Sequence, residues 1–323
     1  MAQTPTELAR TVEIAGTKSG YDAACRLVLS QRIVLAHILK RCVEEYRDCS
    51  PEEICGFIDR DPSVGETEVG RGLSNAFITG NSTDDVSVNE GSVRYDVLFS
   101  SAVPGMKEGR LGLIINVEAQ KVMNPGYSLH RRAAYYSARL VSSQFGADIR
   151  TADYSRLKRV YSIWICYNTP EEHRNSINMY RKREETLEGR GFGDDAGADL
   201  SREIVICTGS PDEASGLLRL LSVLFSGKLR SGEKKRILSS EFSMPMTREI
   251  DKGVTEMCNL SEGIYEEGRI EGRAEDVRAL MENLSCSAEK AMDLLDVPQS
   301  ERSALINTGL IVPGQQSEPS AAF

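Results

Sequence analysis

The sequence predicts an α/β fold with a helical C-terminal extension, and three observations lead to this class. Two β-like runs, residues 93–99 and 111–120, flank a turn-rich segment around Pro104, which is the pattern of an antiparallel hairpin. A helix-like run follows, and then a strand that is apolar on both faces, residues 159–167. From Arg248 onward the chain is acidic and helical in pattern.

The composition is that of an ordinary globular protein, with 323 residues, of which 40% are hydrophobic and 27% charged. This length predicts one to two domains with enough chain to bury a core. No apolar run approaches the roughly 18 residues of a transmembrane helix, and the N-terminus lacks the apolar core of a secretory signal. We therefore expect a cytoplasmic protein with no membrane partner. The 8 cysteines show no CxxC spacing, which favours buried or incidental thiols over a zinc or disulfide framework.

The N-terminal part of the chain predicts helices that cover a sheet. Residues 1–24 are polar and weakly patterned, and we expect a flexible N-terminus there. Apolar residues recur at helical spacing over 31–46, which predicts an amphipathic helix. Ser50, followed by proline and acidic residues, is typical of a helix start. Residues 61–90 are rich in Gly, Ser, Asn and Asp and contain one short strand candidate, residues 76–79.

Polar side chains converge at one end of the predicted hairpin. Because side chains alternate along a strand, Asn116, Glu118 and Gln120 share one face. Asp96 lies within the first β-like run, and pairing through the hairpin loop brings its carboxylate beside Glu118. Two carboxylates with a nearby amide are suitable ligands for a hard cation.

The run over residues 127–144 predicts a helix with a polar face. Arg132, Tyr136 and Arg139 recur at intervals of three or four residues and can project together towards a phosphate backbone. The alternative is a solvated arginine face with no ligand.

The rest of the chain continues the sheet and then becomes helical. Residues 168–199 are long and polar, and we expect an irregular insertion. Residues 203–207 predict a further buried strand, and residues 214–225 predict an apolar helix. Near the C-terminus, two short helices over 287–306 lack a basic face, which favours packing or homo-oligomer formation over DNA reading. Glycines interrupt the acidic helix before them, so we expect it to fray or to extend from the body of the protein.

Several segments resemble the PD-(D/E)XK nuclease superfamily, and more closely its branch of transposases and recombination-promoting nucleases. These segments are LIINVEAQ at residues 113–120, NPGYSLHRRAAYYSARLVSSQ at 124–144, VYSIWIC at 160–166 and MCNLSEGIYEEG at 257–268. The resemblance extends from about Leu29 to the C-terminal helices. It implies a mixed-sheet αβββαβ restriction-endonuclease-like core. The expected domains are a flexible N-terminus at 1–24, the nuclease-like domain at 25–245, a helical C-terminal extension at 246–310 and a disordered tail at 311–323.

The resemblance also implies the roles of individual residues. Asp96 matches the metal-binding aspartate of the family, and Glu118 and Gln120 match its E-x-K motif, with glutamine where lysine usually stands. Asp96 and Glu118 would hold Mg²⁺, or Mn²⁺ in its place. Glu45 matches an acidic residue that can reach the metal from the first core helix, although a surface carboxylate in an acidic pair fits it equally. An amide at position 120 can orient water but carries no positive charge.

Together these features predict a metal-dependent deoxyribonuclease that hydrolyses DNA phosphodiester bonds. The net charge of −9 argues against it, because proteins that bind DNA nonspecifically usually present a basic surface. A second hypothesis is a catalytically silent module that keeps the fold for DNA binding or protein assembly. A third is an unrelated α/β interaction protein in which the pattern of acids is accidental. Sequence specificity, oligomeric state and biological setting stay open.

Overall fold

The structure is a computed structural model, and it describes residues 19–58, 63–64, 68–70, 84–87, 91–105, 111–147, 153–193, 197–306 and 311. The chain divides into two compact units, one of residues 23–255 and one of residues 1–22 together with 256–323. The predicted α/β class is confirmed, since strands and helices both contribute to residues 23–255.

A 6-stranded mixed sheet forms the centre of residues 23–255, with strand order β1-β5-β6-β7-β9-β8. Its strands are β1 (Ser63–Val64), β5 (Val97–Ala102), β6 (Leu111–Val122), β7 (Arg159–Asn168), β8 (Ser176–Arg181) and β9 (Ser201–Cys207). β5 and β6 form the predicted antiparallel hairpin, whereas β6, β7 and β9 are parallel. A separate 3-stranded sheet consists of β2 (Glu68–Gly70), β3 (Asp84–Ser87) and β4 (Gly91–Arg94).

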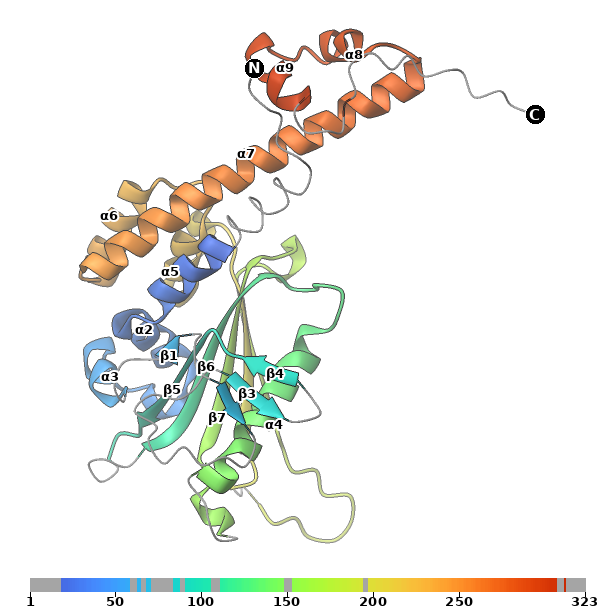
Figure 1. The fold of residues 1–323 in the computed structure, drawn as a ribbon. Coiled ribbons are helices and arrows are strands. Elements are labelled where there is room, and N and C mark those ends of the chain that lie inside the picture. The colour runs from blue at the N-terminus through green and yellow to red at the C-terminus, as the bar shows by residue number, and fades with distance from the viewer. Residues whose placement is uncertain are drawn as a thin grey trace. The chain divides into compact units, whose positions relative to one another are not determined.

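Helices cover both faces of the large sheet (Figure 1). On one face lie α2 (Arg32–Cys42), α3 (Pro51–Phe57) and α5 (Gly216–Phe225), with α6 (Ser231–Phe242) beyond them. On the other face α4 (Leu129–Ala147) forms the crossover between the parallel strands β6 and β7. The start of α3 is as predicted: the Ser50 hydroxyl accepts from the Glu53 N–H, and the Glu53 carboxylate accepts from the Ser50 N–H.

The core between the sheet and α4 is aromatic at its centre. Trp164 on β7 is fully buried, and the Tyr136 ring of α4 packs edge-on against it with centroids 5.2 Å apart. Leu129, Ala133 and Leu140 of α4 belong to the same cluster. α4 therefore turns its apolar face towards the strand ends that carry the polar residues of β6.

The structure corrects three sequence expectations. The run over 93–99 is not one strand, because β4 ends at Arg94 and β5 begins at Val97, which leaves Asp96 in a bend between them. The expected irregular insertion over 168–199 contains β8, which pairs with β9 at the sheet edge. The acidic helix α7 (Arg248–Leu284) runs through its glycines as one element. The strand expected at 76–79 and the tail at 312–323 lie outside the described residues.

The C-terminal unit has a core of its own. The second half of α7 packs with α8 (Ala288–Leu294) and α9 (Gln299–Ile306) around buried Val277, Ala291 and Leu305. Leu284 and Leu294 stay on the surface, 59% and 50% exposed. In the part of the chain that is described, no helix combines the length and apolar character needed to cross a membrane.

Candidate active site

The structure brings Asp96 and Glu118 into direct contact at the end of the β5–β6 hairpin. Val97 pairs with Val117 and Leu98 with Asn116, so Asp96 follows the same register and lies opposite Glu118. The Asp96 N–H donates to Oε1 of Glu118 at 3.1 Å, and the Ala119 N–H donates to Oδ2 of Asp96 at 3.0 Å. The bend at Asp96 frees its N–H from the strand ladder, which makes the first of these contacts available.

Glu118 is a buried carboxylate beside a second one. Its residue is 4% exposed, and it lies opposite Trp164 in the β6–β7 pairing. Burial raises the pKa of Glu118 well above its usual range, and the negative charge of Asp96 adds to the rise. The Asp96 N–H, the Arg132 charge and the Asn116 amide oppose that rise without cancelling it. A buried pair of this kind favours either a proton or a bound cation.

Asn116 completes a set of oxygen atoms at this position. Its Nδ2 donates to Oε1 of Glu118 at 3.3 Å, and its fully buried Oδ1 has no hydrogen-bond partner in the described structure. Buried polar atoms are rarely left unpaired, so this oxygen is suited to a ligand. No group of three or more His, Cys, Asp or Glu side chains with metal-binding geometry occurs among the described residues. Two carboxylates with an amide oxygen and water nevertheless fit Mg²⁺, which is commonly held by one or two carboxylates plus substrate phosphate.

Gln120 lies on the same face of β6 as Glu118, two residues further along the strand and half-buried. Lys121, which is exposed, takes the opposite face and does not replace the missing lysine. The E-x-Q segment, residues 118–120, therefore carries no positively charged side chain.

The expected arginine face of α4 is turned inward. Tyr136 and Arg139 are each only 8% exposed, and Tyr136 belongs to the aromatic core. The Arg132 guanidinium donates to the hydroxyls of Tyr127 and Tyr136 at 2.7 and 2.8 Å, and its centre lies 5.2 Å from the Trp164 ring. The helical spacing of these residues is as expected, but their shared face is directed to the sheet because Leu129, Ala133 and Leu140 lie on it too. Arg132 thus belongs to the surroundings of Glu118 rather than to an open cationic face.

Glu45 is held away from the carboxylate pair. One of its oxygens accepts from Arg159 at 2.7 Å, and the other accepts from the Tyr161 hydroxyl at 2.7 Å. Tyr161 and Trp164 stand an odd number of residues apart on β7, so they point to opposite faces of the sheet. The structure does not bring Glu45 to Asp96 and Glu118, and its ion pair with Arg159 accounts for its burial.

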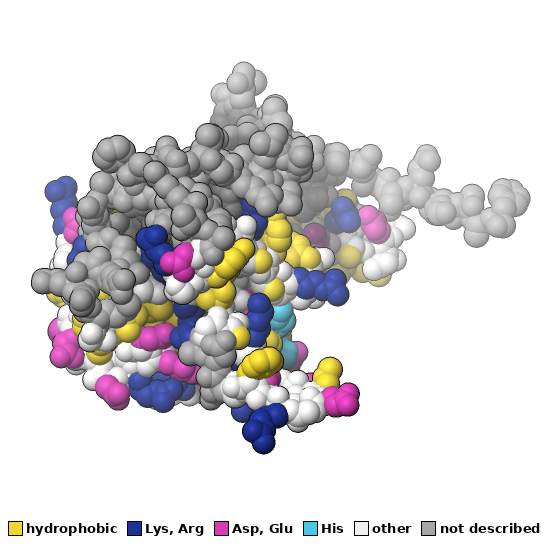
Figure 2. Space-filling view, turned by 90° about the horizontal axis from the view of Figure 1, so that it is seen from below, with side chains coloured by type: hydrophobic (Ala, Val, Ile, Leu, Met, Phe, Trp, Pro, Cys, Tyr) yellow, Lys and Arg dark blue, Asp and Glu magenta, His cyan; other side chains and the backbone are white. Residues whose placement is uncertain are grey.

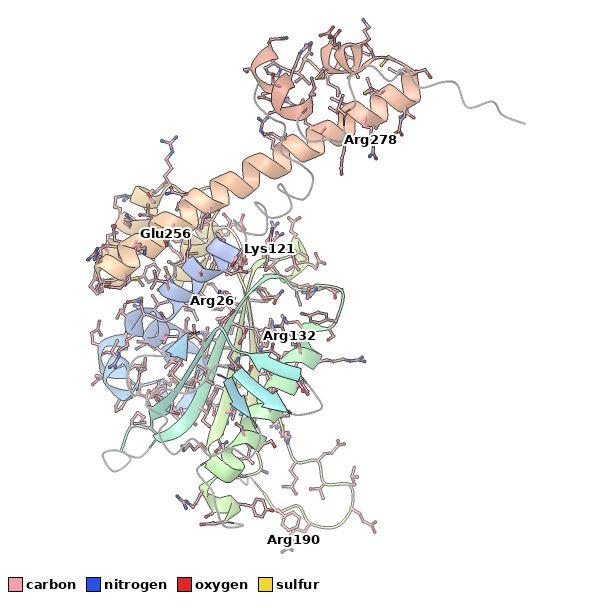
Figure 3. All side chains as sticks on the ribbon, in the orientation of Figure 1. Arg26, Lys121, Arg132, Arg190, Glu256 and Arg278 are labelled. Atoms are coloured by element: carbon pink, nitrogen blue, oxygen red, sulfur yellow. The ribbon has the colours of Figure 1, made fainter. Side chains whose placement is uncertain are left out.

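Arg26 is a site residue that sequence reasoning missed. It lies in the helix over residues 19–29, and its guanidinium contacts Oδ1 of Asp96 at 3.3 Å. Figure 3 shows Arg26 and Arg132 projecting from two different helices near the strands of the sheet. Arg26 and Asp96 are 70 positions apart in the sequence, and no local pattern predicts such a contact.

A cavity of ≈ 850 Å³ lies at the carboxyl ends of β6 and β7, and neither Asp96 nor Glu118 lines it. Tyr127, which bonds to Arg132, lines it together with His130, His173 and Arg174. Ligands of open α/β sheets commonly bind beyond the carboxyl ends of the strands. Elsewhere positive and negative side chains are interspersed on the described part of the face shown in Figure 2, with no continuous basic surface.

Comparisons of the chain with protein-family models, with curated proteins and with solved structures find no match.

Proposed function

We propose that this protein is a metal-dependent DNA endonuclease of the PD-(D/E)XK type. The observation that carries the proposal is the contact between Asp96, in the bend before β5, and Glu118 of β6, whose carboxylates are in part withdrawn from water. Burial raises the pKa of Glu118, and the second carboxylate beside it, that of Asp96, adds to the rise, as is common at functional sites.

The order of elements supports the same assignment. Helix α2 precedes β1, the β5–β6 hairpin carries the two acids, and α4 leads to the parallel strand β7. This order agrees with the αβββαβ core that the resemblance implies. The strands β8 and β9 extend the sheet beyond that core.

The residues divide the expected chemistry among themselves. Asp96 and Glu118 would hold Mg²⁺ or Mn²⁺ together with the free oxygen of Asn116. Such a cation would polarise the scissile phosphate and lower the pKa of bound water. The Gln120 amide, on the same face of β6, would orient a water molecule by a hydrogen bond. DNA approaches through the cavity at the carboxyl ends of β6 and β7.

We place the activity in the cytoplasm, in transposition or recombination. The exposed Leu284 and Leu294 support self-association through the C-terminal helices.

The specific alternative is a catalytically silent module with the same fold. Two observations favour it: the chain is acidic overall, with a net charge of −9, and the arginine face expected to bind phosphate is buried. The burial of Glu118 beside a second carboxylate opposes it, because a buried carboxylate without a cation is unfavourable for folding.

Cleavage of plasmid DNA by the purified full chain tests the proposal. Nicking is expected with Mg²⁺ or Mn²⁺ and is abolished by EDTA. Asp96→Asn keeps the size of the side chain but removes its charge, so the rate should fall at least about 100-fold. Asp212→Asn, at an exposed aspartate, is the matched control and should cleave like the original protein. Cleavage that persists in Asp96→Asn, or none at all over a panel of divalent ions and DNA forms, overturns the nuclease assignment.

A further inference from the structure

The E-x-Q segment leaves the candidate site without its usual cation, yet a guanidinium is already present. Arg26 contacts Oδ1 of Asp96 at 3.3 Å, with 26% of its side chain exposed and 21% of that of Asp96. The other oxygen of Asp96 accepts the Ala119 N–H. Arg26 and Ala119 thus engage both oxygens through which Asp96 could bind a metal ion.

The exposure of Arg26 allows it to leave this position. An arginine confined by several acceptors would be fixed, as Arg202 is by Asp199, Glu44 and Tyr161. For Arg26, the contact with Asp96 at 3.3 Å is longer than the 2.7–2.9 Å of a strong charge-assisted hydrogen bond. A divalent cation has the larger charge and can displace it from Asp96.

We propose that Arg26 is a positioning residue that neutralises Asp96 while the site is empty and moves to a phosphate of DNA when a divalent cation binds Asp96. The guanidinium then supplies, from the N-terminal helix, the positive charge that Gln120 does not. A planar fork of N–H donors suits phosphate as well as it suits carboxylate. This inference rests on the proposed function, since it assigns Asp96 to a metal site.

The exchange has two measurable parts, and neither requires cleavage. Removing the charge with Arg26→Gln frees Asp96, so Mn²⁺ should bind about two- to five-fold more tightly, the range expected for losing a partly exposed ion pair. The same variant should bind duplex DNA more weakly in Ca²⁺, and the slope of log affinity against log salt should fall by about 0.9, one phosphate contact. Arg26→Lys keeps a charge and should restore much of the DNA affinity.

The experiment uses the full-length protein with Mn²⁺ as probe, measured by electron paramagnetic resonance of the free ion. Asp96→Asn defines the Mn²⁺ binding that depends on this site, because an acidic chain also binds the ion elsewhere. Arg41→Gln, at an exposed arginine of α2, is the matched control and should change neither quantity. Circular dichroism verifies that each variant is folded.

Each outcome separates this inference from the proposed function. Tighter Mn²⁺ binding together with a smaller salt slope in Arg26→Gln supports the exchange, even if no DNA is cut. Unchanged or weaker Mn²⁺ binding shows that Arg26 does not compete at Asp96 and overturns it. An unchanged salt slope shows that Arg26 does not reach phosphate and overturns it as well. If the original protein binds Mn²⁺ no better than Asp96→Asn does, the metal site and this inference are both rejected. Absence of cleavage alone rejects only the nuclease activity.

Discussion

Glu118 is a residue whose protonation affects the stability of the folded protein. Burial and the charge of Asp96 raise its pKa, so the folded protein holds this proton more tightly than the unfolded chain does. A group whose pKa is raised by folding adds its full contribution to stability at pH values below its pKa in the unfolded chain. That contribution is lost as the pH rises through the higher pKa of the folded state. At neutral pH and without metal, Glu118 is therefore a destabilising feature, because folding must either keep its proton or bury its charge.

Glu118→Gln should stabilise the metal-free protein at neutral pH, because it keeps the shape and removes a carboxyl group whose ionisation favours the unfolded chain. The expected gain is roughly 1 kcal/mol, or about 2–4 °C in melting temperature for a unit of this size. The gain should shrink as the pH falls below the ordinary glutamate pKa, where the original side chain is protonated in both states. Thermal melts in EDTA over a pH series measure it.

The matched control for this substitution is Glu188→Gln, in the exposed segment between β8 and β9, which should leave the melting temperature unchanged at every pH. Mg²⁺ should stabilise the original protein but not Glu118→Gln, since binding to the folded state alone raises stability. A lower melting temperature for Glu118→Gln at neutral pH without metal would contradict the unfavourable charge.

At the residue scale, the sequence predicts contacts within the hairpin but not contacts between distant segments. Alternation along β6 and a short hairpin suffice to bring Glu118 towards Asp96, which are 22 positions apart. Glu45 meets Arg159 across 114 positions, and nothing local indicates that partner. Tyr136 shows a different limit: spacing identifies which residues share a helix face, but not whether that face is directed to solvent or to the sheet.

Among the elements, β9 is fixed to the N-terminal helices through one buried arginine. Arg202 is 5% exposed and donates to Asp199, to the Tyr161 hydroxyl and to Glu44 at 2.7, 2.8 and 2.7 Å. These partners come from the segment before β9, from β7 and from the turn after α2. The same guanidinium thus joins three parts of residues 23–255.

Arg202→Ala should lower the free energy of unfolding by about 3–5 kcal/mol, because it leaves buried acceptors without their partner. Arg181→Ala is the matched control: Arg181 pairs with the same Glu44, but its side chain is 44% exposed, and a surface pair contributes about 1 kcal/mol or less. Urea unfolding followed by fluorescence gives both values. Equal effects of the two substitutions would show that burial of Arg202 adds nothing to the network.

Element prediction fails where an element is mostly exposed. β8 pairs along its length with β9, but four of its six residues are exposed, so its sequence shows no alternation of apolar and polar side chains. Buried strands such as β7 are apolar on both faces and are recognised from sequence. The break at Asp96 is missed for a related reason, since a single bend interrupts a run that is otherwise typical of a strand.

On the scale of the whole molecule, two of the hydrophobic clusters among the described residues belong to different units of the chain. One lies between the sheet and α4 and contains Trp164, which is the single tryptophan of the chain. The other lies among α7, α8 and α9 and contains Leu305. The two clusters have no residue in common, so a substitution that destabilises one need not destabilise the other.

Leu305→Ala should destabilise the helical core by about 2–5 kcal/mol, because the side chain is fully buried. The fluorescence of Trp164 reports on the sheet, so its thermal transition should stay in place while part of the helical circular dichroism signal is lost at lower temperature. Leu187→Ala, at a leucine that is 90% exposed, is the control and should shift neither transition. A joint shift of both signals would mean that the two units unfold together.

The spacing of the site contacts along the chain has a consequence for biosynthesis. Asp96 and Glu118 can meet once the hairpin has emerged from the ribosome, whereas burial of Glu118 also requires α4 and Trp164. Contacts between distant segments form only after the intervening chain is available to close the loop. In a nascent chain that ends before β7, Glu118 lacks the burial that raises its pKa in the folded protein. The properties that distinguish this carboxylate pair therefore arise only after translation has passed the middle of the protein.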